Sequence, residues 1–223
     1  MIRRSLTTLS LLVLAAAPLS AQMTGMDKDP TKKVEGNTPL PAGWTGRTDR
    51  ATDKLSDAKF VKMGPGYHVT SGPAAIYWNA AQAVKGPFVA TASFTQTKAP
   101  MHPEAYGVFF MGKDLEGPNQ SYAYLIVRGD GKFMVNHRAG SEVHKIVPWT
   151  DNAAIHKADA SGKATNVLTV DATKPDSVKL LVNGTVVHTL AGKQFGGTDG
   201  IVGLRVNHNL DVHVGEFTVT PEK

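Results

Sequence analysis

Short runs in which apolar and polar residues alternate fill the chain from about residue 44 to its end. Gly, Pro, Asn and Asp separate the runs, and no stretch keeps the period of an amphipathic helix. Thirteen strands are predicted, at Lys59–Met63, Tyr67–Thr70, Ala74–Trp78, Phe88–Gln96, Tyr106–Met111, Tyr122–Arg128, Lys132–Arg138, Val143–Val147, Asn166–Asp171, Val178–Val182, Thr185–Leu190, Ile201–Val206 and Asp211–Val219. So many short strands favour an all-β fold, a two-sheet antiparallel sandwich.

Two connections have the sequence of tight hairpin turns, Asn183-Gly184 and Asp130-Gly131. Both dipeptides tolerate the positive φ angles that such turns require. The segment Asp151–Thr165 is polar and lacks alternation, so it is predicted to be the longest internal loop and a candidate lid.

The N-terminal 21 residues have the pattern of a cleaved signal peptide: Arg3 and Arg4, the apolar stretch Leu9–Ala17, and the small residue Ala21. We therefore divide the chain into a signal at 1–21, a flexible leader at 22–42 and one β-sandwich domain at 43–223. No later segment has the roughly 20 apolar residues of a membrane span. The chain contains no cysteine to carry a lipid, which predicts a secreted or periplasmic protein without a membrane partner.

Composition narrows the function further. The formal net charge of +5 falls to +3 once the two signal arginines are removed, and basic residues alternate with acidic ones. This is not the charge pattern of a nucleic-acid-binding protein. The absence of cysteine excludes disulfides, zinc thiolates and a thiol nucleophile. The oligomeric state stays open.

The C-terminal part of the chain resembles a known family in the string from Gly200 to Val214 and in Phe217-Thr218-Val219. Three shorter strings support the resemblance: Gly43-Trp44, Val182-Asn183-Gly184 and Asn119-Gln120-Ser121-Tyr122. These strings resemble the concanavalin-like jelly rolls, and within them the secreted 3-keto-disaccharide hydrolases. The resemblance implies a jelly-roll sandwich and a carbohydrate ligand. No catalytic residue of that family is carried over to this chain.

Side-chain parity separates core positions from ligand-facing ones, because successive residues of a strand point to opposite faces. Apolar residues at alternate positions of four strands are predicted to point inward: Ala123, Leu125, Val127, Phe133, Val135, Leu204, Val206, Val212 and Val214. The inward set changes parity between Val214 and Phe217, which predicts a β-bulge at Gly215-Glu216.

The opposite parity collects polar and aromatic side chains, which we predict to share one hollow. Tyr122, Tyr124, Arg128, Asn136, Arg138 and Asn207 are the predicted substrate-binding residues. Aromatic rings and paired hydrogen-bond donors suit a sugar. The alternative is a solvated sheet face held by cross-strand pairs.

Three residues are the candidate catalytic set: Asp211, His213 and Arg205. A histidine oriented by a carboxylate is a general base, and an arginine stabilises negative charge. The alternative is a purely structural role. Two sets of residues have the side-chain types of metal ligands. The first is His208, Asp211 and His213, and the second, an oxygen-rich set suited to calcium, is Asp114, Glu116 and Asn119. Neither spacing is diagnostic, and no cofactor is predicted.

Three functions remain open from the sequence. The first is a secreted carbohydrate-binding or carbohydrate-active jelly roll with its ligand on the concave sheet. The second is a hydrolase of 3-keto-disaccharides or related glycosides, and the third is a non-catalytic structural or adhesion module.

Overall fold

A computed structural model describes residues 29–36, 39–174, 176–192 and 196–222. The predicted signal peptide at 1–21 lies outside the described residues, as does the start of the leader. The described residues contain no helix with the length and hydropathy of a membrane span.

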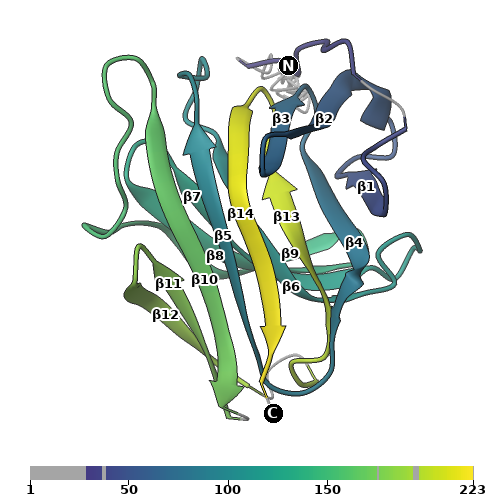
Figure 1. Cartoon of the computed structure of the whole chain (residues 1–223), viewed down its shortest axis with the longest axis vertical. Helices are drawn as coiled ribbons and strands as arrows, with labels where there is room; N and C mark the ends of the chain where they lie inside the picture. Colours follow the sequence, from purple (N-terminus) through teal and green to yellow (C-terminus); the bar gives the residue numbers. More distant parts are fainter. Residues whose placement is uncertain (1–28, 37–38, 175, 193–195, 223) are drawn as a thin grey trace, which may run out of the picture.

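The described residues form fourteen strands in two antiparallel sheets of seven strands, which lie face to face (Figure 1). The first sheet has the order β1-β4-β13-β6-β7-β8-β9. Its strands are β1 (Trp44–Thr48), β4 (Ala75–Val84), β13 (Gly200–Val206), β6 (Ala105–Lys113), β7 (Ser121–Arg128), β8 (Lys132–Ala139) and β9 (Glu142–Asp151). The predicted two-sheet sandwich is therefore confirmed.

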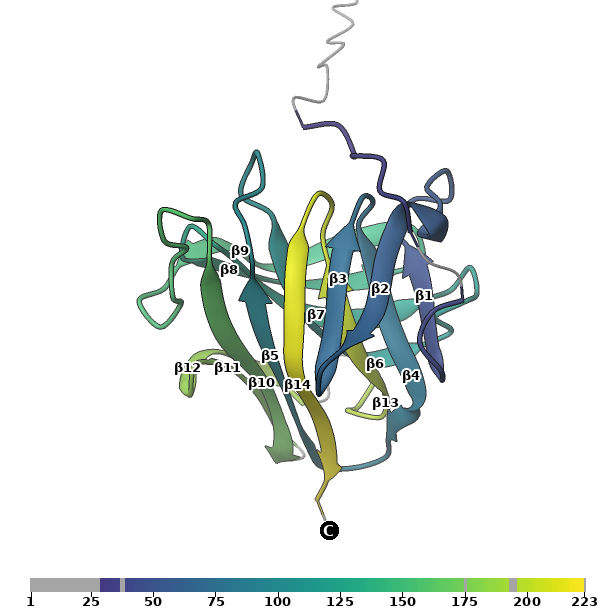
Figure 2. The same cartoon turned by 45° about the horizontal axis from the view of Figure 1, so that its top comes forward.

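The second sheet has the order β12-β11-β10-β5-β14-β3-β2. Its strands are β12 (Thr185–Ala191), β11 (Ser177–Val182), β10 (Ala164–Lys174), β5 (Phe88–Gln96), β14 (Asp211–Pro221), β3 (Gly66–Ser71) and β2 (Ala58–Met63). A single 3₁₀ turn, η1 (Leu55–Asp57), precedes β2. In Figure 2 the two layers are seen with the N-terminal segment at the top and the C-terminus at the bottom.

The core fills the space between the sheets, and it contains the side chains that parity assigned to it. All nine predicted inward residues of β7, β8, β13 and β14 belong to this cluster: Ala123, Leu125, Val127, Phe133, Val135, Leu204, Val206, Val212 and Val214. The alternation in the sequence thus predicts which side of each strand is buried against the other sheet.

The predicted turns and bulge are also present. Asn183 and Gly184, between β11 and β12, have φ angles of 48° and 80°, and Gly131, between β7 and β8, has a φ of 89°. The pairing of β14 with β5 shifts register between Val214 and Phe217, which is the predicted bulge. The shift lets Phe217 pack against the core although its parity differs from that of Val214.

Two N-terminal features differ from the sequence prediction. Strand β1 was not predicted, because its sequence Trp-Thr-Gly-Arg-Thr has a central glycine and no apolar alternation. Part of the predicted leader also contacts the domain: Lys32 donates its backbone N–H to Asn209 Oδ1 at 2.7 Å, and Gly36 donates to the Ser56 carbonyl at 3.0 Å.

Candidate functional site

The outer face of the first sheet carries a second apolar cluster, separate from the core. Its buried members come from β4, β6, β7 and the loop after β6: Ile76, Trp78, Ala105, Phe109, Leu115, Tyr122, Tyr124 and Ile126. The predicted binding residues of β7 and β8 lie on this face, because they alternate with core residues. We call it the first-sheet outer face.

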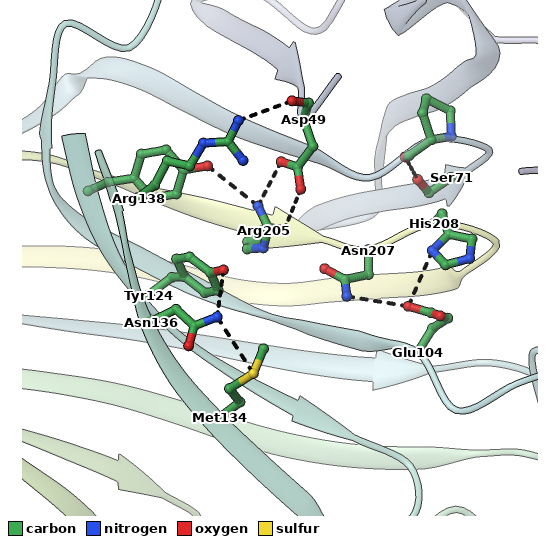
Figure 3. Close-up of polar contacts among 12 residues, drawn as sticks. Asp49, Ser71, Glu104, Tyr124, Met134, Asn136, Arg138, Arg205, Asn207 and His208 are labelled. Atoms are coloured by element: carbon green, nitrogen blue, oxygen red, sulfur yellow. Dashed lines mark hydrogen bonds and ion pairs between the residues drawn. The ribbon is translucent and has the colours of Figure 1, made fainter. Parts of the chain in front are cut away.

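An ion pair joins β13 to the loop after β1 on this face (Figure 3). Arg205 donates from Nη1 to Asp49 Oδ1 at 2.9 Å and from Nη2 to Asp49 Oδ2 at 2.6 Å. The Arg205 guanidinium also lies 4.6 Å from the centre of the Tyr124 ring. Only 6% of Arg205 is exposed, so this pair is largely removed from solvent.

The charges of this pair stabilise each other. Burial alone would raise the pKa of Asp49, but the charge and hydrogen bonds of Arg205, with Arg138 and Arg50, hold that pKa below its ordinary value. Burial would lower the pKa of Arg205, and Asp49 more than compensates, so the pKa is raised. Asp49 is therefore an ionised carboxylate held in one orientation.

Tyrosine and asparagine side chains continue the polar contacts across β7 and β8. Asn136 donates from Nδ2 to the Tyr124 hydroxyl at 3.0 Å, while its buried Oδ1 has no hydrogen-bond partner among the described residues. The rings of Tyr122 and Tyr124 lie 5.8 Å apart, and burial raises the pKa of Tyr122 to about 12. Both tyrosines are nearly inaccessible, at 2% and 4% exposed.

The two remaining predicted arginines lie toward the margins of this face. Arg128 lies 4.2 Å over the Trp149 ring and donates to both carboxylate oxygens of Asp130. Arg138 donates from Nε to the Gly140 carbonyl at 2.9 Å and from Nη2 to the Asp49 carbonyl at 3.2 Å. Both arginines are only partly buried.

A loop closes over the middle of the face, which corrects the predicted open hollow. Arg47 of β1 donates from Nη1 to the carbonyls of Leu115 and Gly117, at 2.8 and 2.7 Å. These bonds hold the β6–β7 loop so that Leu115 packs into the second apolar cluster. Tyr122 and Tyr124 belong to the same cluster and are nearly inaccessible, so they are not an exposed surface on which a sugar ring could stack.

The open part of the face is a cavity of about 510 Å³ beside that loop. Its polar lining comes from β1, the following loop, the β6–β7 loop and β8, and includes Arg47, Asp49, Glu116, Gln120, Arg138 and Ser141. A smaller cavity of about 200 Å³ shares Asp49 and is lined also by Thr31, Arg205, Asn207 and His208. The Arg205–Asp49 pair therefore borders both cavities.

Arg47, Asp49 and Gln120 line this cavity, although no sequence pattern marked them as site residues. For Arg47 and Asp49 the signal is the density of charge soon after Trp44, where Arg47, Asp49, Arg50 and Asp53 fall within seven residues. Gln120 appears in the sequence only as part of the string Asn119-Gln120-Ser121-Tyr122. A charged loop beside an unpredicted strand has no motif that marks it as part of a binding face.

Asp211 and His213 lie elsewhere, which corrects the prediction that they share a hollow with Arg205. They belong to β14, and their neighbours on β3 and β5 place them on the outer face of the second sheet. The chain changes sheets in the turn at 207–210, where Asn209 has a φ of 58°. Parity grouped the outward residues of β13 and β14 on one face, whereas the two strands belong to different sheets.

The predicted Asp211–His213 dyad is likewise not formed in the described part of the chain. The imidazole that contacts Asp211 is His68, whose Nε2 lies 3.1 Å from Oδ1. Lys98 Nζ lies 2.9 Å from Oδ2, and the hydroxyl of Thr97 also donates to the carboxylate. Burial raises the pKa of Asp211, but the bonds from Lys98 and Thr97 and the charge of His68 lower it below its ordinary value.

The predicted metal-ligand set of His208, Asp211 and His213 does not converge, because His208 precedes the change of sheet. In the calcium candidate, Asp114 Oδ2 accepts the backbone N–H of Asn119 at 2.9 Å, so this carboxylate caps its own loop. Of the groups of three or more His, Asp or Glu among the described residues, the one whose ligand atoms converge is Asp29, Glu104 and His208.

The loop that was predicted as a lid borders a third cavity, of about 260 Å³. Ala158 of this loop lines it together with Gln96, Met101 and Gly129. The two cavities beside Asp49 are lined by other segments, so this loop does not cover them.

The two antiparallel sheets form a jelly-roll β-sandwich, and solved structures with a similar fold include a carbohydrate-binding module and glucanase-type proteins. A carbohydrate-binding module, CBM66 from Bacillus subtilis, has a TM-score of 0.58 at 14% identity over 80% of this chain and 95% of its own. A β-glucanase from Bacillus licheniformis has a TM-score of 0.55 at 12% identity, covering 87% of this chain and 97% of its own. A GH16 protein of a mixed-linkage glucan locus from Bacteroides ovatus has a TM-score of 0.53 at 9% identity, covering 79% and 94%.

No protein-family model matches the chain, and no curated protein matches it in sequence. The similarity to these solved structures therefore establishes the fold, while the individual family stays open.

Proposed function

We propose that this protein is a secreted or periplasmic carbohydrate-binding jelly roll whose ligand occupies the 510 Å³ cavity of the first-sheet outer face. The observation that carries the proposal is the lining of this cavity by arginine, carboxylate, amide and hydroxyl groups around the fixed Asp49 carboxylate. Arginine and carboxylate groups form paired hydrogen bonds with sugar hydroxyls.

The lining of the cavity carries charges of both signs. Arg47 and Arg138 supply two positive charges, and Asp49 and Glu116 supply two negative ones. Asp49 and Arg138 are held by bonds to Arg205 and Gly140, so they are oriented before a ligand arrives. Such preorganisation reduces the entropy that binding costs.

The similarity in fold supports the same proposal. One structural neighbour is named as a carbohydrate-binding module and another as a β-glucanase. Because one fold hosts many functions, the cavity and its side chains, rather than the fold, carry the argument.

A glycan array followed by titration calorimetry tests this function. We expect Glu116→Gln and Ser141→Ala, both at exposed positions of the lining, to weaken binding of the best glycan, Glu116→Gln by about tenfold, since a hydrogen bond to a charged group contributes about 1.5–3 kcal/mol. His213→Gln, on the other sheet, is the control and should leave affinity within about twofold. Absence of glycan binding, or an equal loss in the control, would overturn the proposal.

A glycoside hydrolase is the second candidate, and one observation favours it. Asp49 and Glu116 are two carboxyl groups on one cavity, and glycosidases use such a pair. The predicted catalytic set of Asp211, His213 and Arg205 lies on two outer faces and gives no support. The test is an assay for turnover of 3-keto-glucosides and of ordinary glycosides. Turnover that is lost in Glu116→Gln and kept in His213→Gln would favour the hydrolase. Binding without turnover would exclude hydrolysis of those substrates.

A further inference from the structure

A cluster of ligand-type side chains lies where the N-terminal segment meets the ends of two strands. Asp29 precedes β1, Glu104 precedes β6 and His208 follows β13, and one ligand atom from each lies within 4.8 Å of the others. The three residues come from segments that are far apart in the sequence, so their convergence is a property of the fold.

The imidazole of His208 lies between the two carboxylates. Its Nδ1 is 3.5 Å from Glu104 Oε2, and its Nε2 is 3.6 Å from Asp29 Oδ2. Figure 3 shows Glu104 and His208 facing each other, with Asn207 beside them. At these distances the imidazole lies close to both carboxylates but forms no short hydrogen bond with either of them.

The two acids of the cluster are largely removed from solvent. The side chains of Asp29 and Glu104 are only 7% and 13% exposed, so water screens their repulsion poorly. A divalent cation would neutralise both and would leave the histidine neutral, in the form that binds metal.

Neighbouring amides already orient the carboxylates. Asn209 donates from Nδ2 to Asp29 Oδ1 at 2.9 Å, and Asn207 donates from Nδ2 to Glu104 Oε2 at 3.3 Å. Such outer-shell bonds commonly fix metal ligands.

We propose that Asp29, Glu104 and His208 bind one divalent transition-metal ion of the Zn²⁺ or Mn²⁺ type. Two carboxylates with one imidazole suit these ions, whereas Ca²⁺ prefers a shell made wholly of oxygen. The ion ties the N-terminal segment to the sandwich. It also lies at the wall of the 200 Å³ cavity, because Thr31, Asn207 and His208 line that cavity.

Calorimetric titration of the untagged full chain, secreted so that its own processing occurs, tests the site with ZnCl₂, MnCl₂ and CaCl₂. We expect one ion per chain, with Zn²⁺ or Mn²⁺ bound at least tenfold more tightly than Ca²⁺. Glu104→Gln and His208→Gln should each weaken binding about 100-fold or more, because even loss of an outer-shell partner costs about 10–100-fold.

The exposed pair Glu142 and His144 provides the matched control, since its carboxylate and imidazole lie 3.7 Å apart without a third ligand. Glu142→Gln and His144→Gln should leave the affinity within twofold. The metal-induced rise in melting temperature, compared within each variant, separates ion binding from loss of folding. No ion bound by the wild-type chain, full binding retained by the Glu104 and His208 variants, or preference for Ca²⁺ would overturn the proposal.

Discussion

The two outer faces of the sandwich differ although both are built from alternating strands. On the first sheet, several outward residues form a buried apolar cluster with Leu115 of the β6–β7 loop, and Arg205 forms a buried ion pair with Asp49. On the second sheet, outward threonines form cross-strand bonds, Thr91 with Thr169 at 3.2 Å and Thr95 with Thr165 at 2.8 Å. Alternation therefore identifies the core, whereas loops decide whether the other side becomes a site or a solvated surface.

The largest effect is expected at the buried ion pair. Arg205→Met removes the partner of Asp49 on the covered face, and breaking such a pair costs about 3–5 kcal/mol because a charge is left unpaired. Denaturant unfolding measures this loss. The double variant Asp49→Asn with Arg205→Met should recover part of it, and a double variant less stable than Arg205→Met would contradict this explanation.

Leu115→Ala is expected to have the next largest effect. This side chain is 4% exposed and packs into the second apolar cluster, so truncation should destabilise the protein by about 2–5 kcal/mol. Val186→Ala on β12, where the valine is 47% exposed, should change stability by less than about 0.5 kcal/mol. Calorimetric melting measures both changes in stability. If the two variants were destabilised equally, the proposed difference between the covered and the open face would be wrong.

Acid should weaken both faces. The pKa values of Asp49 and Asp211 lie below the ordinary value of 3.8, so their stabilisation is complete above that value and is lost as pH falls through the lowered pKa values. Asp211→Asn should lower stability at neutral pH and reduce its pH dependence below about pH 4. The midpoints of urea unfolding, measured from pH 7 to pH 2, check this prediction. If the midpoints of wild type and Asp211→Asn fall equally with pH, Asp211 contributes nothing to the loss of stability in acid.

The smallest effect is expected in the threonine pairs. Thr95→Val removes the bond to Thr165 on the second sheet but keeps a β-branched side chain, so the change should be within about 1 kcal/mol. Glycan affinity should stay unchanged, because Thr95 is on the face opposite the proposed cavity. A loss of affinity in this variant would move the ligand to the second sheet.

The strands other than β1, together with the core parity, the turns and the bulge, could be predicted from the sequence, because each depends on neighbours within one or two strands. Leu125 and Val214 are examples, since alternation alone assigns them to the core. The sheet to which β13 and β14 belong could not be predicted that way, because it depends on the long-range pairing of β13 with β4 and β6.

The candidate site was predicted only in part for the same reason. Tyr124, Asn136 and Arg205 were grouped correctly by parity. Their cover by Leu115 and the contribution of Asp49 come from loops, whose paths have no period in the sequence. His213 was placed on the wrong face because parity gives the side of a strand to which a residue points but not the sheet to which the strand belongs.

The contacts of Lys32 and Gly36 have a practical consequence for immobilising the protein. The N-terminal segment lies at the end of the sandwich where Thr31 lines the smaller Asp49 cavity, while β14 ends at the opposite end (Figure 2). Attaching the chain to a sensor surface through its C-terminus would thus leave the cavity end facing the bulk solution. Anchoring through the N-terminus would turn the same end toward the support.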